Sequence, residues 1–117
     1  MILTPSGVKV HLALGVTDMR KGMDGLAMLV QSVLKADPFS GHLFAFRGRK
    51  ASLVKMLWWD GTGLCLFTKR LDDRGFPWPS ADVTGETVTL SPAQLSMLLE
   101  GIDWRAPERR WQPAAAG

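Results

Sequence analysis

Residues 54–70 read VKMLWWDGTGLCLFTKR, and this stretch decides how the chain is expected to fold. Two apolar runs, 52–59 and 64–71, flank the segment Asp60-Gly61-Thr62-Gly63. Aspartate and glycine between two such runs are a strong turn signal, because glycine adopts the backbone angles that a tight reversal needs. The stretch therefore predicts a β-hairpin whose two strands are largely apolar on both faces.

The segments before and after the hairpin predict further strands and the first of two helices. Apolar runs indicate strands at 8–14, 42–46 and 87–90. Between the first two of these, apolar residues follow one another at helical spacing from an N-cap at Thr17 or Asp18. This helix is expected to end before Pro38, because the residue that precedes a proline avoids helical backbone angles.

The second helix is predicted from the sequence Ser91-Pro92-Ala93-Gln94, in which serine caps, proline takes the first turn and glutamine completes a capping box. Gly101 is expected to end it. The fold class is therefore α+β, a single small domain with an antiparallel meander of about four to five strands and two main helices. Because the central strands are apolar on both faces, either each face carries a helix or one face binds a partner.

Composition limits the class of protein. Of 117 residues 46% are hydrophobic, enough for one ordinary domain with a core, and 21% are charged, too few for a disordered tail protein. A single cysteine excludes an internal disulfide and fits a reducing cytoplasm. The chain shows neither a secretion signal nor an apolar run of about 20 residues, so we expect no membrane span. The domain is expected over 1–107, with a mobile tail at 108–117.

Positive charge is unevenly distributed. The formal net charge is +3, but one short segment holds six bases and a single acid, Asp60. These bases are Arg47, Arg49, Lys50, Lys55, Lys69 and Arg70. Such a local field suits an anionic partner such as nucleic acid. The alternative is a solvated strand edge on which the bases prevent aggregation.

Catalytic, metal-binding and cofactor-binding residues are not indicated. The residues His11, His42 and Cys65 stand at no recognised ligand spacing, and Cys65 lies in an apolar strand that favours an inert thiol. The aspartates are explained by turns and caps, and no set of acids is marked as convergent. The sequence therefore argues against an autonomous nuclease or transposase.

Two features remain compatible with nucleic acid. Arg20 and Lys21 lie near the positive end of the first predicted helix. They either help to bind an anion or are solvated bases whose charge is offset by Asp18 and Asp24. Lys55 and Trp59 share one face of their strand, where an indole beside a base can stack nucleobases. Because Trp58 and Trp59 point to opposite faces, at least one of the two is expected to be structural.

Several separate motifs then resemble one known family. They are DMRKGMDGLAMLVQ (18–31), DPFSGHLFAFRGRK (37–50), LVKMLWWDGTGLCLFTKRL (53–71), FPWP (76–79) and LSPAQLSMLLEGIDW (90–104). In this order they resemble the small accessory proteins, often called TnpB, of the insertion sequence 66 family of bacterial transposable elements. That family is distinct from the RNA-guided nucleases that share the label. The resemblance covers about residues 1–107.

The resemblance implies a non-catalytic role in transposition, beside a separate and larger transposase, and it offers no catalytic residue to carry over. Two functions remain open. In the first, the chain binds DNA through Arg20, Lys21, Arg47, Arg49, Lys50, Lys55, Trp59, Lys69 and Arg70. In the second, it is an adaptor that docks on the transposase without binding DNA, through the second sheet face or through Phe76 and Trp78.

Overall fold

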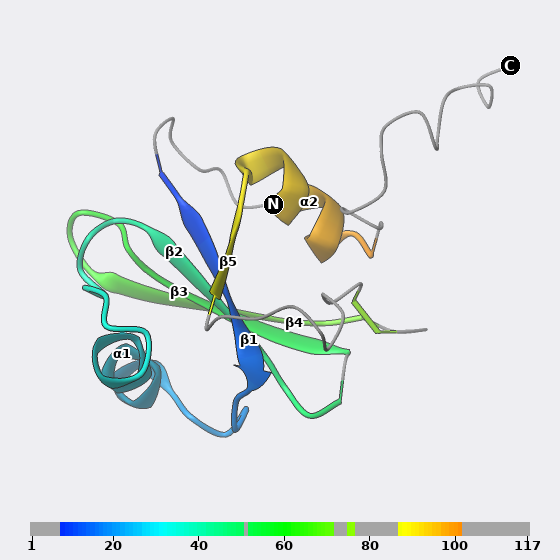
Figure 1. The fold of residues 1–117 in the computed structure, drawn as a ribbon, viewed down its shortest axis with the longest axis horizontal. Helices are drawn as coiled ribbons and strands as arrows, with labels where there is room; N and C mark the ends of the chain where they lie inside the picture. The colour runs from blue at the N-terminus through cyan, green and yellow to red at the C-terminus, as the bar shows by residue number, and fades with distance from the viewer. Residues whose placement is uncertain (1–7, 51, 72–74, 77–86, 102–117) are drawn as a thin grey trace, which may run out of the picture.

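The computed structural model describes residues 8–50, 52–71, 75–76 and 87–101, and these form one mixed sheet with two helices (Figure 1). The elements in chain order are β1 (Val10–Val16), α1 (Met23–Ser32), β2 (Leu43–Arg47), β3 (Leu53–Trp59), β4 (Leu64–Arg70), β5 (Thr87–Leu90) and α2 (Pro92–Leu99). The α+β class with two helices is confirmed. Neither helix in the described ranges is long and apolar enough to cross a membrane.

The sheet has the order β4-β3-β2-β1-β5, which corrects the expectation of a purely antiparallel meander. The strands β2, β3 and β4 do form an antiparallel meander, and β5 runs antiparallel to β1. The strands β1 and β2 are parallel, however, because α1 carries the chain from the end of one strand back to the start of the next. Because β5 pairs with the other side of β1, β1 lies inside the sheet. Because β1 and β2 are parallel, both strands end at the same end of the sheet.

The predicted hairpin is confirmed as β3 and β4, which pair from Leu53 opposite Arg70 to Trp59 opposite Leu64. At the turn, Asp60 Oδ1 accepts hydrogen bonds from the backbone N–H groups of Thr62 and Gly63, each at 2.9 Å. Gly61 has a φ of +106°, a value that favours glycine. The aspartate and the glycine therefore have the structural roles that the sequence indicated.

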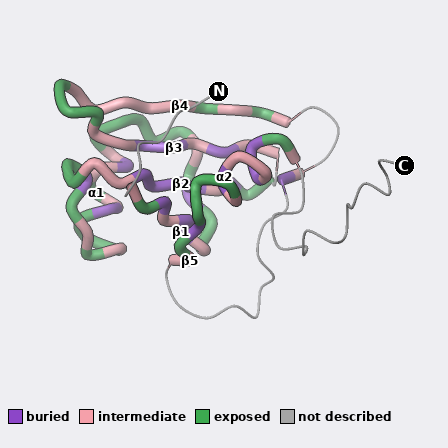
Figure 2. The backbone as a smooth tube through the Cα atoms, turned by 90° about the horizontal axis from the view of Figure 1, so that it is seen from above, coloured by how far each residue is buried: buried purple, intermediate pink, exposed green. Residues whose placement is uncertain are grey.

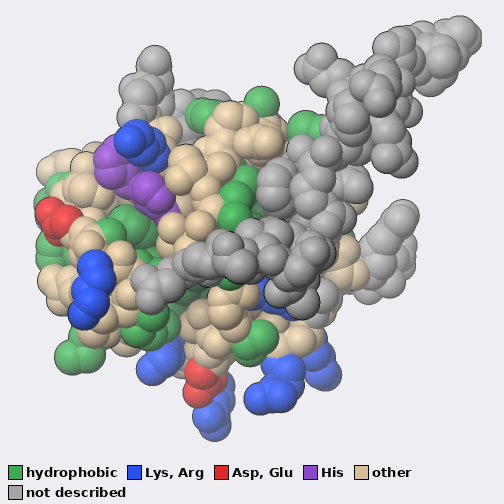
Figure 3. Space-filling model, viewed as in Figure 1, with side chains coloured by type: hydrophobic (Ala, Val, Ile, Leu, Met, Phe, Trp, Pro, Cys, Tyr) green, Lys and Arg blue, Asp and Glu red, His purple; other side chains and the backbone are tan. Residues whose placement is uncertain are grey.

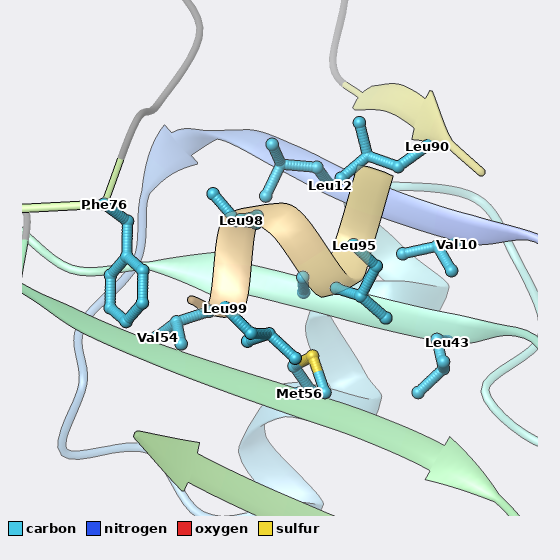
Figure 4. Packing of buried hydrophobic residues seen from close by; sticks show 11 residues of the cluster. Val10, Leu12, Leu43, Val54, Met56, Phe76, Leu90, Leu95, Leu98 and Leu99 are labelled. Carbon is cyan, nitrogen blue, oxygen red and sulfur yellow. The ribbon is translucent and has the colours of Figure 1, made fainter. Parts of the chain in front are cut away.

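Each face of the sheet is covered by one helix, which settles the alternative left open by the apolar strands. Under α1 a core forms from the buried residues Ala13, Leu26, Val30, Phe44, Phe46 and Leu57. On the other face lies a larger core, which Figure 4 draws as sticks. It consists of Val10, Leu12, Leu43, Ala45, Val54, Met56, Phe76, Leu90, Leu95, Leu98 and Leu99. Figure 2 shows the buried residues concentrated in β1, β2 and β3, while β4 at the sheet edge is intermediate or exposed.

The capping box of α2 is confirmed, but α1 begins later than predicted. Ser91 Oγ accepts the backbone N–H of Gln94 at 3.1 Å, and Gln94 Oε1 accepts that of Ser91 at 2.8 Å. The N-cap of α1 is Gly22 and not Thr17 or Asp18. Asp18 does not cap because its carboxylate binds Arg20 two residues further along the chain.

Candidate functional site

Three segments of the chain meet at the end of the sheet where the strands β1 and β2 terminate. They are the segment from β1 to α1, the turn from β2 to β3, and the end of β4. Together they line a hollow of about 800 Å³, which we call the basic hollow. Its polar and charged lining is Thr17, Asp18, Arg20, Arg49, Lys50, Ser52 and Arg70.

Backbone hydrogen bonds hold these connections together. Thr17 N–H donates to the carbonyl of Arg47 at 2.8 Å, which extends the pairing of β1 and β2 past the strand end. The N–H of Leu71 donates to the carbonyl of Ser52 at 2.8 Å, which ties the end of β4 to the start of β3. These bonds tie the residues on either side of the β2–β3 turn to the neighbouring segments of the sheet.

Gly48 fits this arrangement because it has no side chain. A Cβ atom at this position would lie 2.5 Å from Met19 Cγ, a distance that real Cβ atoms essentially never show. The glycine between Arg47 and Arg49 therefore lets the connection from β1 to α1 pack directly on the β2–β3 turn, with both connections lining the hollow.

Among the residues that the structure describes, four cations and one carboxylate line the basic hollow. The side chains of Arg49, Lys50 and Arg70 are exposed, and the carboxylates in the described part of the chain form no ion pair with them. The carboxylate of Asp18 is instead paired with Arg20, which holds the pKa of the Asp18 carboxyl group well below its usual range. Figure 3 shows Lys and Arg side chains gathered along the lower border of the molecule with one acidic group among them.

The nine residues predicted to bind nucleic acid do not form one surface. Arg20, Arg49, Lys50 and Arg70 come together at the basic hollow. Lys21 lies beside it on the connection to α1, and Arg47 is a half-buried residue at the end of β2. The remaining three, Lys55, Lys69 and Trp59, lie elsewhere.

Lys55 and Lys69 are used inside the molecule. Lys55 Nζ donates to the backbone carbonyl of Lys21 at 2.9 Å, on the α1 face of the sheet. Lys69 Nζ donates to the carbonyl of Leu99 at 2.6 Å, on the opposite face, at the end of α2. A cation at a helix C-terminus interacts favourably with the unpaired carbonyls there. Both ammonium groups therefore hold connections and helix ends in place.

Trp59 lies at the other end of β3 from the basic hollow. It stands six residues after Leu53, which is about 20 Å along a strand. Its ring packs edge to face against Phe39, with centroids 5.7 Å apart and planes at 79°. The basic residues therefore gather at the open end of the hairpin and not around its turn, and Trp59 does not line the hollow that they form.

The predicted partner-binding residues are also placed differently from expectation. Phe76 is 3% exposed and packs in the core beneath α2 (Figure 4). Its ring therefore stabilises the second sheet face instead of offering an interface. Trp78, like the predicted tail at 108–117, lies outside the described residues.

The two histidines contact one another, and the cysteine lies apart from them on β4. The ring of His11 stacks on Phe44 and lies edge to face with the ring of His42, with ring centroids 5.6 Å apart. His42 Nδ1 accepts a hydrogen bond from the backbone N–H of Lys9. Burial, reinforced by His42, lowers the pKa of His11. Burial also raises the pKa of the Cys65 thiol. In the part of the chain that is described, no three His, Cys, Asp or Glu residues are grouped as a metal ion requires.

The sequence offers Asp18 two roles, a helix cap or an acid that offsets the charge of Arg20 and Lys21, and the structure shows its carboxylate paired with Arg20. Sequence reasoning missed Ser52 as part of the lining, because no pattern marks the serine that follows a basic turn.

Comparison with known proteins places the chain in a family. The family described as "IS66 Orf2 like protein" matches residues 8–109. Two proteins of Sinorhizobium fredii (strain NBRC 101917 / NGR234) are similar to the chain: the uncharacterized protein y4hO and the uncharacterized protein y4jC. The protein y4hO is 56% identical over 98% of this chain and all of its own length. The protein y4jC is 36% identical over 94% of this chain and 92% of its own length. No solved structure matches. The chain therefore belongs to the IS66 Orf2-like family and is an accessory protein of the transposition of such elements.

Proposed function

We propose that this accessory protein is not an enzyme and that it binds nucleic acid by its phosphate backbone at the basic hollow. The observation that carries the proposal is the grouping of Arg49, Lys50 and Arg70, three exposed cations from two connections, around one concave surface. No described carboxylate neutralises them. Cations presented in this way release counterions from a polyanion, which is the main source of affinity for phosphate backbones.

The arrangement supports backbone contact more than the reading of bases. Arginine and lysine bind phosphate without reference to sequence, and contacts of this kind fix position rather than specificity. Hydrogen bonds on either side of the β2–β3 turn anchor the segments that present these cations, which favours binding because less of the backbone has to be ordered. DNA is the expected polyanion, because the family acts in the transposition of a DNA element.

A salt titration tests this function. The purified chain is titrated with a duplex of about 20 base pairs between about 50 and 250 mM salt, and the logarithm of the association constant is plotted against that of the salt concentration. Three phosphate contacts predict a slope of about −2.7, because each contributes about −0.9. The double substitution Arg49→Gln/Lys50→Gln is expected to weaken binding and to reduce the slope by about 1.8.

A charge-matched variant provides the control. Lys9 and Lys35 are exposed but do not line the basic hollow, so Lys9→Gln/Lys35→Gln removes the same charge elsewhere. This variant should keep the slope of the unsubstituted chain. Equal slopes for the two double variants would mean that general positive charge binds the duplex and that the hollow is not the site.

A second candidate function, docking on the separate transposase, is supported by a neighbouring surface that shares Val16, Thr17 and Asp18 with the basic hollow. Between β1 and α1 lies a groove of about 470 Å³ with an apolar lining that includes Val16, Leu29, Val33 and Phe46. Val16 is 57% exposed and Val33 46%, so both add exposed apolar surface to the groove. Exposed apolar surface around a groove is typical of protein interfaces.

The docking function is tested by pull-down of the purified transposase in nuclease-treated buffer. Val33→Asp is expected to reduce the recovered transposase, because it places a charge in the apolar groove. Met28→Asp is the control, since Met28 is 66% exposed on α1 but does not line the groove. Recovery that Val33→Asp leaves unchanged would reject the groove as the docking surface.

A further inference from the structure

The basic hollow contains a carboxylate whose position is fixed by the arginine beside it. Asp18 Oδ2 accepts Arg20 Nη2–H at 2.9 Å, and Oδ1 accepts Nε–H at 3.0 Å. Oδ1 also accepts the backbone N–H of Arg20 at 2.9 Å. The Asp18 side chain is 43% exposed and that of Arg20 is 91% exposed. The pair therefore stands at the open border of the hollow, within reach of a bound polyanion.

The contact that Asp18 makes is the contact that a phosphate would make. A guanidinium group binds carboxylates and phosphates through the same pair of parallel N–H donors. In this structure the Nε and Nη2 donors of Arg20 are occupied by the two carboxylate oxygens. Because the residues are two apart and the backbone N–H binds the same carboxylate, holding the pair closed requires little ordering of the chain.

We propose that Asp18 is an intramolecular competitor that keeps Arg20 away from phosphate, so that the basic hollow neutralises fewer phosphates than its four cations would allow. This inference rests on the proposed function of the hollow. Arg49, Lys50 and Arg70 make the contacts, while the Asp18–Arg20 pair contributes almost no net charge. The consequence is a weaker, less salt-sensitive hold on any polyanion.

Four proteins separate this role from a general effect of charge: the unsubstituted chain, Asp18→Asn, Arg20→Gln and the double variant. Asparagine retains an oxygen that can accept the backbone N–H of Arg20, so the connection is expected to keep its shape. Each protein is titrated with the same 20-base-pair duplex over a range of salt concentrations. The slope is the readout, because it counts contacts with phosphate and not merely net charge.

The expected slopes differ in a way that charge alone does not produce. Asp18→Asn should steepen the slope by about 0.9 and tighten binding about five- to tenfold near 0.1 M salt, because Arg20 becomes available. Arg20→Gln alone should leave the slope unchanged, because Arg20 makes no phosphate contact while Asp18 holds it. The double variant should return to the slope of the unsubstituted chain. Asp24→Asn removes an exposed acid from the first turn of α1, outside the hollow, and should also leave the slope unchanged.

Two results would overturn the inference and leave the proposed function intact. In the first, the duplex binds but Asp18→Asn has the slope of the unsubstituted chain. In the second, Arg20→Gln alone reduces the slope by about 0.9, so that Arg20 contacts phosphate although Asp18 is present. If none of the four proteins binds the duplex, the proposed function and this inference are both wrong.

Discussion

Neighbouring cations in β4 are expected to have opposite functions, and two single substitutions test this. Successive side chains of a strand point to opposite faces. Lys69 is paired with Val54 and points toward α2, whereas Arg70 is paired with Leu53 and lines the basic hollow. The sequence gives both residues a positive charge at the end of one hairpin strand, but only one of them faces the site.

Lys69→Met is expected to lower stability without changing phosphate contact. The substitution removes a hydrogen bond of 2.6 Å from a half-buried ammonium group to the carbonyl of Leu99, while the methionine keeps the apolar stem. Hydrogen bonds to charged groups contribute about 1.5–3 kcal/mol, and partial exposure reduces this to about 1–2 kcal/mol. For a domain of this size that corresponds to a fall in Tm of about 4–8 °C.

Arg70→Gln is the matched variant, because it removes the same charge one residue further along. Arg70 is exposed, so the free energy of unfolding should change by less than about 0.5 kcal/mol. The slope of duplex affinity against salt should fall by about 0.9, whereas Lys69→Met should leave it unchanged. The measurements are thermal unfolding by circular dichroism and the duplex titration. If Lys69→Met reduced the slope and left Tm unchanged, the division of roles between the two faces would be refuted.

Substitutions at three further positions, Gly48 beside the hollow and Ser91 and His11 elsewhere in the fold, are tested by thermal or denaturant unfolding. Gly48→Ala should lower the free energy of unfolding by about 1–3 kcal/mol, because the new methyl group overpacks against Met19. The double variant Gly48→Ala/Met19→Ala should recover part of this loss of stability. Ser91→Ala should lower the free energy of unfolding by about 1 kcal/mol, because it breaks the capping box of α2. Ser91→Asp should keep most of the stability, because aspartate also caps helices. The pKa of His11 is lower in the folded chain than in the unfolded one, so the unfolded chain takes up the proton first as the pH falls. The free energy of unfolding should therefore have its full value above about pH 7 and decrease as the pH drops below about 6.5. The substitution His11→Gln should make the free energy of unfolding depend less on pH in this range. Stability that does not change between pH 7.5 and 5.5 would contradict this role.

Elements with a local cause were predictable from the sequence. The β3–β4 turn follows from the side chain of Asp60 and the backbone of Gly61, both within four residues. The start of α2 likewise follows from Ser91 and Gln94, which satisfy one another's backbone groups. In each case the interacting atoms are close in the chain, so the pattern of residue types is enough to specify the geometry.

The order of the strands was not predictable in this way. Nothing local to β1 indicates that it lies between β2 and β5, because both neighbours are chosen by pairing across the sheet. The start of α1 was missed for a related reason. Asp18 has two possible partners, the N–H groups of a helix that would start immediately and the guanidinium of Arg20, and the charged partner is the one that the structure contains.

The candidate site depends on both kinds of information. The sequence alone predicted a basic surface, but it counted Lys55 and Lys69 among the binding residues because both charges lie near the hairpin. Whether a cation is available to a partner depends on which face its strand position points to and on what covers that face. A helix carbonyl binds Lys69 and the carbonyl of Lys21 binds Lys55, whereas the side chain of Arg70 remains at the hollow. The number of free cations is therefore set by the placement of the two helices, which the charges themselves do not specify.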